Sequence, residues 1–102
     1  MIKINNLEWQ IKITDSFEET LFGRTDYDTL TIFISSRTCS QTQQRTLKHE
    51  FIHAYLHSYG FMFKDNFTRE DICEFIAHNL DILTNLYETA RKELKRCLAL
   101  RN

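Results

Sequence analysis

The chain has 102 residues, of which 42% are hydrophobic and 13% are aromatic. This length allows one domain and is too short for two, and the composition is that of a packed protein rather than a disordered one. The net charge of −1 gives no field that would attract nucleic acid or an anionic membrane, and the chain lacks a signal peptide and an apolar run of about 18 residues. We therefore expect a cytoplasmic, single-domain protein over residues 1–102, with neither a membrane nor nucleic acid as a partner.

Hydrophobic and polar residues alternate near the N-terminus with the period of a β-strand. Ile2 and Ile4 form one short run, and a longer run extends from Leu7 to Ile13. Asn5-Asn6 between them suits the tight turn of a hairpin. Residues 17–22 fit either a helical turn or a loop.

Gly23 is one of only two glycines, so we expect it to mark a turn with positive φ. The third strand is predicted at Leu30–Ile34, because apolar, β-branched residues recur there. Three short strands with one apolar face need a cover. The sequence therefore predicts an α+β fold, in which a small three-stranded antiparallel or mixed sheet packs on two or three helices.

The first helix is predicted over residues 41–59. Ser40 and Gln43 have the spacing of a capping box, with Ser40 as the N-cap, and Gly60 is suited to the C-terminal end.

The last helix is predicted to begin after Thr68, a good N-cap residue. Its apolar residues repeat at helical spacing. They are Ile72, Phe75, Ile76, Leu80, Leu83, Tyr87, Ala90 and Leu94. The pattern leaves open whether one helix continues to Leu100 or a break near Thr84-Asn85 divides it. Five basic residues in the tail, residues 91–101, are interpreted as a solvated face.

The three cysteines are widely spaced and form no C-x-x-C pair, which argues against a disulfide framework or a cysteine zinc site. We expect reduced thiols, with Cys39 the most exposed because it lies in a predicted loop.

The first predicted helix contains the run His49-Glu50-Phe51-Ile52-His53. Histidines four residues apart project from the same side of a helix, so both imidazoles can bind one metal ion. The glutamate between them can act as a base toward a water at that metal. The motif is in register with an apolar stripe that should be buried, formed by Leu47, Phe51, Ala54 and Tyr55.

A catalytic zinc site needs a third protein ligand. His57 is excluded beside His49 and His53, because eight residues span about 12 Å of helix axis. Glu70, Asp71, Glu74 and Asp81 are the candidates on the next helix.

Glu74 is assigned as the third ligand because its neighbours at residues 72–77 are all apolar, and a carboxylate buried there would need a partner. Possible supporting groups, near the metal or at the oxyanion, are His78, Tyr55, Tyr59 and Asp81.

The order of these features resembles the ImmA/IrrE family. The resemblance is carried by Gly23, Tyr27 and Leu30-Thr31-Ile32, then by the segments 46–54 and Glu74-Phe75-Ile76-Ala77. It is closest to the short, single-domain members found in phages and prophages. The resemblance implies a gluzincin-type zinc metallopeptidase, with His49, His53 and Glu74 on the metal and Glu50 as general base.

The expected function is hydrolysis of a peptide bond in a protein or peptide substrate, with zinc as the cofactor. The strand near residues 29–35 is a candidate edge for pairing with an extended substrate. The alternative is a weakly active or inactive phage protein that acts by binding a host or phage protein. The sequence does not determine the oligomeric state.

Overall fold

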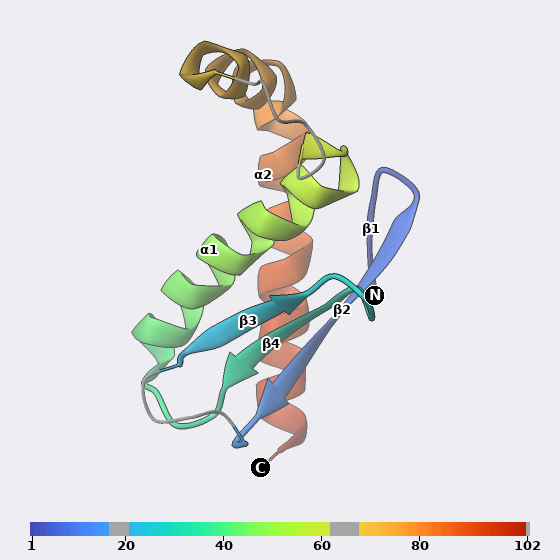
Figure 1. The fold of residues 1–102 in the computed structure, drawn as a ribbon. Coiled ribbons are helices and arrows are strands. Elements are labelled where there is room, and N and C mark those ends of the chain that lie inside the picture. The colour runs from blue at the N-terminus through green and yellow to red at the C-terminus, as the bar shows by residue number, and fades with distance from the viewer. Residues whose placement is uncertain (17–20, 62–67, 102) are drawn as a thin grey trace.

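A computed structural model describes residues 1–16, 21–61 and 68–101 of the chain. The expected helical turn or loop at residues 17–22 lies partly outside these ranges. The elements follow in the order β1 (Ile2–Ile4), β2 (Leu7–Thr14), β3 (Gly23–Asp26), β4 (Thr31–Ser35), α1 (Ser40–Ser58) and α2 (Arg69–Leu100) (Figure 1). The fold is α+β, as the order of strands and helices in the sequence predicted.

The N-terminal hairpin is confirmed. β1 pairs antiparallel with β2, with Ile4 opposite Leu7 and Ile2 opposite Trp9. Asn5 and Asn6 both have positive φ, 46° and 69°, which is the conformation that a two-residue hairpin turn requires and that asparagine tolerates.

The sheet has four strands, in the order β1-β2-β4-β3, rather than the three that were predicted. The additional strand is β3, which pairs antiparallel with β4, while β2 and β4 are parallel. The prediction of a turn at Gly23 is wrong, because Gly23 is the first residue of β3. A Cβ at this position would meet the Thr46 side chain, the Phe33 carbonyl and Glu50 Cγ. Glycine is therefore needed for the close approach of β3 to α1.

β4 begins one residue later than predicted. Leu30 has a φ of 52° and belongs to the turn that connects β3 to β4. Ile32 and Ile34 are fully buried on one face of the sheet. Phe33 lies on the opposite face, where the guanidinium of Arg24 is 5.1 Å from the centre of its ring.

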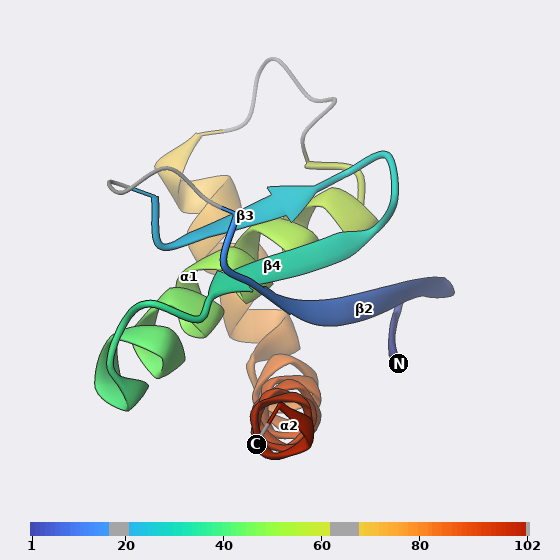
Figure 2. The ribbon, with the colours of Figure 1, turned by 90° about the horizontal axis from the view of Figure 1, so that it is seen from below.

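Both helices pack on the sheet, with α1 against β3 and β4 and α2 against β1 and β2 (Figure 2). A cluster of buried side chains joins β1, β2 and β4 to both helices. The stripe predicted on α1 is confirmed, since Leu47, Phe51, Ala54 and Tyr55 are all buried.

The predicted capping box at Ser40 is wrong. Cys39 is the N-cap residue, and its side chain makes no capping hydrogen bond. Gln43 is buried instead, and its Nε2 donates a 3.1 Å hydrogen bond to the carbonyl of Ser35. Gln43 thereby fixes the end of β4 to the first turn of α1. At the other end of α1, Gly60 has a φ of 81°, as expected of a C-terminal glycine.

α2 is one continuous helix from Arg69 to Leu100, which resolves the question of a break. Thr68 caps it as predicted, and Asp71 completes a capping box. The N-terminal turns of α2 project beyond the sheet (Figure 1), so Leu80, predicted to lie on the apolar stripe, is 52% exposed. Among the described helices, none combines the length and the apolar character that a membrane crossing requires.

Cys39 and Cys97 should differ in reactivity. The hydroxyl of Thr42, 3.4 Å from the sulfur, lowers the pKa of the exposed Cys39 thiol, whereas burial raises the pKa of Cys97. A lower pKa leaves more thiolate at neutral pH, so Cys39 should react faster with iodoacetamide, and its rate should rise at lower pH than that of Cys97. Mass spectrometry of timed samples measures both rates. Thr42→Val should slow only Cys39, and equal rates in the wild type would contradict this prediction.

Candidate functional site

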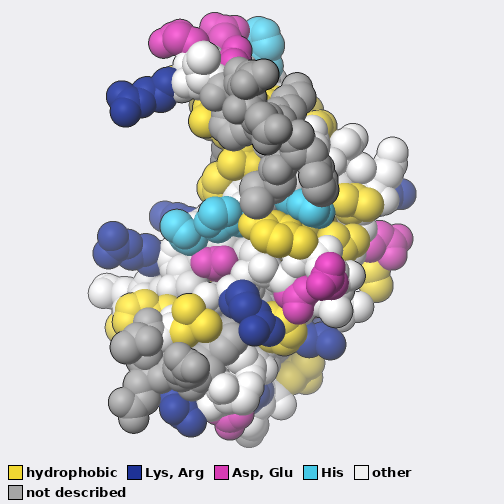
Figure 3. Space-filling view, in the orientation of Figure 1, with side chains coloured by type: hydrophobic (Ala, Val, Ile, Leu, Met, Phe, Trp, Pro, Cys, Tyr) yellow, Lys and Arg dark blue, Asp and Glu magenta, His cyan; other side chains and the backbone are white. Residues whose placement is uncertain are grey.

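His49 and His53 converge on the surface of α1. Their Nε2 atoms are 3.2 Å apart, and the ring centroids are 4.9 Å apart. The His49 side chain is 70% exposed, and histidine side chains are visible on the surface in Figure 3. The four-residue spacing therefore places two imidazole nitrogens side by side where a metal could reach them.

This separation fits two ligands of one zinc ion. Two nitrogens each about 2.05 Å from a tetrahedral zinc are about 3.3 Å apart. At the observed distance one ring can also donate a hydrogen bond to the other, so the geometry shows convergence rather than the metal itself. The distance between the two nitrogens is therefore compatible with two of the four ligands of a tetrahedral zinc ion.

Glu50 lies beside this pair in a largely buried position. Its side chain is 13% exposed, and Oε2 is 4.0 Å from His49 Nε2. The other carboxylate oxygen, Oε1, accepts a 2.8 Å hydrogen bond from the hydroxyl of Thr25 on β3. The same hydroxyl is 3.1 Å from the Glu50 backbone carbonyl. One oxygen is thus anchored to the sheet, and the other lies near His49.

A surface pocket of about 470 Å³ opens between α1 and the start of β3. It gives the motif glutamate and the first motif histidine a shared, accessible space. The lining residues are Phe22, Gly23, Thr42, Arg45, Thr46, His49 and Glu50.

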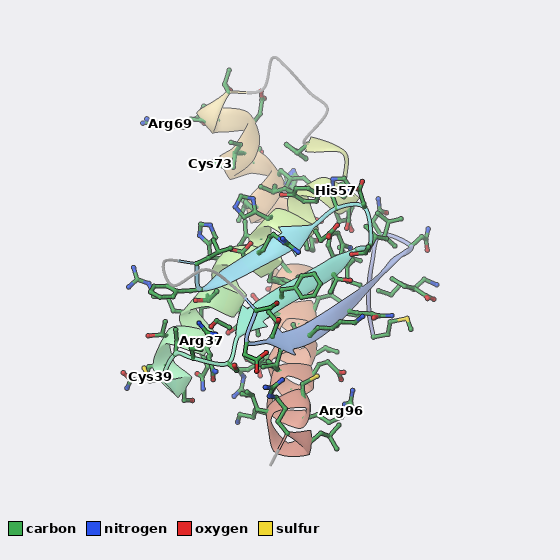
Figure 4. The ribbon with its side chains drawn as sticks, turned by 60° about the horizontal axis from the view of Figure 1, so that its bottom comes forward. Arg37, Cys39, His57, Arg69, Cys73 and Arg96 are labelled. Atoms are coloured by element: carbon green, nitrogen blue, oxygen red, sulfur yellow. The ribbon has the colours of Figure 1, made fainter. Side chains whose placement is uncertain are left out.

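The structure does not bring Glu74 to the histidine pair. Its side chain is 74% exposed and lies 3.9 Å from His78. The neighbouring Cys73 is at the N-terminal end of α2, at the far end of that helix from the sheet (Figure 4). Within the described residues, no group of three His, Cys, Asp or Glu side chains could hold a metal ion.

The burial assumed for Glu74 in its apolar segment is therefore wrong. This part of α2 projects beyond the core, so only one side of the segment is covered. Cys73 and Ala77 are exposed together with Glu74, whereas Phe75 and Ile76 are partly buried.

The two tyrosines proposed as helpers are engaged elsewhere. Tyr55 is fully buried, and its hydroxyl donates to Asn79 Oδ1 at 3.1 Å. Burial also raises the pKa of Tyr55, which keeps the phenol protonated. Tyr59 packs against Tyr55 and Phe75, with ring centroids 5.0 and 5.3 Å away. Both tyrosines contribute to the contact between α1 and α2.

His78 and Asp81 are exposed on α2. In the part of the chain that is described, neither makes a hydrogen bond or ion pair with the motif residues. His57, excluded as a ligand by its spacing, stacks on Tyr27 at 4.6 Å and meets the edge of Trp9 at 6.1 Å. It lies near the end of α1, away from the start of the helix where Cys39 is found (Figure 4).

Sequence reasoning missed Thr25 and assigned the sheet edge to the wrong strand. β4, which contains most of residues 29–35, pairs with β2 on one side and β3 on the other, so it has no free edge. β3 is the outer strand on the side of α1. Its four residues, Gly-Arg-Thr-Asp, carry no apolar alternation, and the only signals were a β-branched threonine and a nearby glycine.

The model of the family described as Peptidase M78, IrrE N-terminal-like domain, matches residues 11–98. No curated protein and no solved structure matches the chain. The family match spans β2 to the last turns of α2 and confirms the resemblance found in the sequence. Because it covers most of the chain, we conclude that this protein belongs to the Peptidase M78 family of IrrE N-terminal-like domains.

Proposed function

We propose that this protein is a zinc-dependent peptidase of gluzincin type, acting on a protein or peptide in the cytoplasm. The observation that carries the proposal is the convergence of His49 and His53 Nε2 atoms at 3.2 Å, with the Glu50 carboxylate 4.0 Å from His49. A zinc ion held by the pair would polarise the scissile carbonyl and acidify the attacking water.

Glu50 acts as the general base in this proposal. Its Oε2 accepts the proton that the water loses on attack and then delivers it to the leaving nitrogen of the broken peptide bond. A carboxylate with one oxygen anchored by Thr25 and the other near His49 is suited to this transfer. The alternative of a protein that only binds a partner is not favoured, since a purely structural metal site needs no base at this position.

Glu74 remains the proposed third ligand. Its binding requires the first turns of α2 to take a different position relative to α1, because Glu74 is 74% exposed and is not grouped with the histidines. Such a shift would have to replace the contacts that Phe75 and Asn79 make with Tyr55 on α1.

An extended substrate is proposed to pair with β3. This strand is the free edge of the sheet next to α1, and its backbone can donate and accept hydrogen bonds on the outer side. A peptide added there would run past Glu50 and the pocket at Gly23.

Metal analysis tests the proposed ligands. We expect one zinc per chain in the wild type, strongly reduced binding in His53→Ala, and weakened binding in Glu74→Ala, because each variant loses a ligand. Glu8→Ala, which removes an exposed carboxylate on β2 that is not a candidate ligand, is the control and should bind zinc like the wild type. Titration calorimetry with zinc measures the affinities. Full affinity in Glu74→Ala would remove Glu74 from the site, and absence of zinc from the wild type would refute the metal site.

Peptide cleavage tests the reaction itself. The protein is incubated with a library of defined peptides, and new termini are mapped by mass spectrometry. We expect cuts that disappear with a chelator and return when zinc is added. A zinc-loaded wild type that cuts no peptide in the library would contradict the proposed function.

A further inference from the structure

We infer that Thr25 is the positioning residue of Glu50, holding one carboxylate oxygen so that the other is presented to the reaction. This inference rests on the proposed function, since it assigns Thr25 a role through the general base. The observation is the contact between the Thr25 hydroxyl and two acceptors of Glu50, Oε1 at 2.8 Å and the backbone carbonyl at 3.1 Å.

The contact holds both the backbone and the side chain of Glu50. A hydroxyl carries a single proton, so Thr25 shares it between the two Glu50 oxygens as a three-centre hydrogen bond. The backbone acceptor holds β3 in place against α1. The side-chain acceptor then further restricts the rotamers of Glu50, whose carboxylate ends a flexible side chain. With Oε1 held, Oε2 is the oxygen left near His49 Nε2.

Threonine suits this role better than a flexible donor would. Its branched Cβ limits χ1, and the β3 backbone sets the direction of the side chain. The hydroxyl therefore loses little conformational freedom when it bonds to Glu50. Thr25 lies two residues after Gly23, on the same face of the strand. The lack of a side chain at Gly23 lets this face approach Thr46 and Glu50 closely. Gly23 allows β3 to approach α1 closely, and Thr25 makes the hydrogen bond to Glu50.

The sheet thereby contributes to a site whose motif lies wholly on a helix. The position of the Glu50 carboxylate therefore depends on the distance between β3 and α1 as well as on the helix that carries Glu50. Because β3 is also the outer strand of the sheet, the residue that orients Glu50 lies on the strand beside which an extended substrate would pair.

Three isosteric or near-isosteric variants separate positioning from support of the fold. Thr25→Val keeps the branched shape and loses the donor, whereas Thr25→Ser keeps the donor. Thr31→Val is the matched control, because it removes a hydroxyl from the neighbouring strand that is hydrogen-bonded to Thr29 rather than to Glu50. The kinetics use the best-cleaved peptide of the library, and zinc affinity is measured by calorimetry.

For Thr25→Val we expect kcat to fall by about 10- to 100-fold, with KM and zinc affinity within about twofold of the wild type. Thr25→Ser should restore kcat to within about threefold, and Thr31→Val should match the wild type. In crystal structures, the Glu50 carboxylate should leave its position in Thr25→Val and keep it in Thr25→Ser.

An unchanged kcat in Thr25→Val, or a carboxylate that stays in place there, would overturn the inference. So would equal losses in Thr25→Val and Thr31→Val, because these would indicate general support of the sheet. A wild type that hydrolyses no peptide, together with a displaced carboxylate in Thr25→Val, would instead refute the peptidase while leaving the anchoring contact in place.

Discussion

Replacing Glu50 with glutamine is expected to abolish peptide hydrolysis while zinc binding remains. The substitution preserves the shape of the side chain, and its amide oxygen can still accept from Thr25, which in the wild type donates to Oε1 at 2.8 Å. An amide cannot accept the proton that an attacking water must lose. Since general base catalysis contributes about 10²- to 10⁴-fold, kcat should fall by at least about 100-fold.

The measurement combines peptide turnover with zinc titration on the same preparation. Glu8→Gln makes the same chemical change at an exposed position on β2 and should leave both quantities unaltered. If Glu50→Gln cuts the peptide as fast as the wild type, Glu50 is not the base. If it loses zinc as well as activity, Glu50 supports the metal site instead.

Among the substitutions proposed here, Trp9→Ala is expected to cause the largest decrease in the free energy of unfolding. Trp9 is fully buried, and its indole Nε1 donates a 2.8 Å hydrogen bond to Ser58 Oγ at the end of α1. Removal of a buried tryptophan costs about 3–5 kcal/mol. A domain of this size has a free energy of unfolding of about 5–15 kcal/mol in total, so Trp9→Ala should lose a substantial fraction of its stability.

Urea unfolding followed by circular dichroism is the suitable measurement, because Trp9 is the only tryptophan and its fluorescence disappears in the variant. Trp9→Phe should lose about 1–3 kcal/mol, since it keeps much of the ring volume and loses the hydrogen bond. Ser58→Ala removes the acceptor and should lose about 1 kcal/mol. A loss below about 1 kcal/mol in Trp9→Ala would contradict the packing of the hairpin on α1.

The features that the sequence predicted correctly are local ones. Alternation over Leu7–Ile13, the Asn5-Asn6 turn and the buried stripe of α1 each depend on the geometry of one element or one hairpin. The same applies to the motif, because a four-residue spacing on a helix brings His49 and His53 together whatever surrounds them.

Other features depended on how the elements pack. β3 has no apolar alternation, so its formation is decided by pairing with β4 and by the space that Gly23 leaves beside α1. The same packing decides the contact of Thr25 with Glu50, which joins residues 25 positions apart. Packing also decides the exposure of Glu74. Its apolar neighbours suggested burial, but the projection of α2 beyond the sheet leaves its side chain exposed.

The sequence by itself determined that His49 and His53 come together beside Glu50 on α1, and it determined most of the secondary structure, because these follow from periodicities within single helices and strands. Only the tertiary structure decided which strand forms the edge beside the motif, which hydroxyl donates a hydrogen bond to Glu50 and where the proposed third ligand lies. The physical reason is that these features are distances between separate elements, and such distances are set by the joint packing of the sheet and both helices.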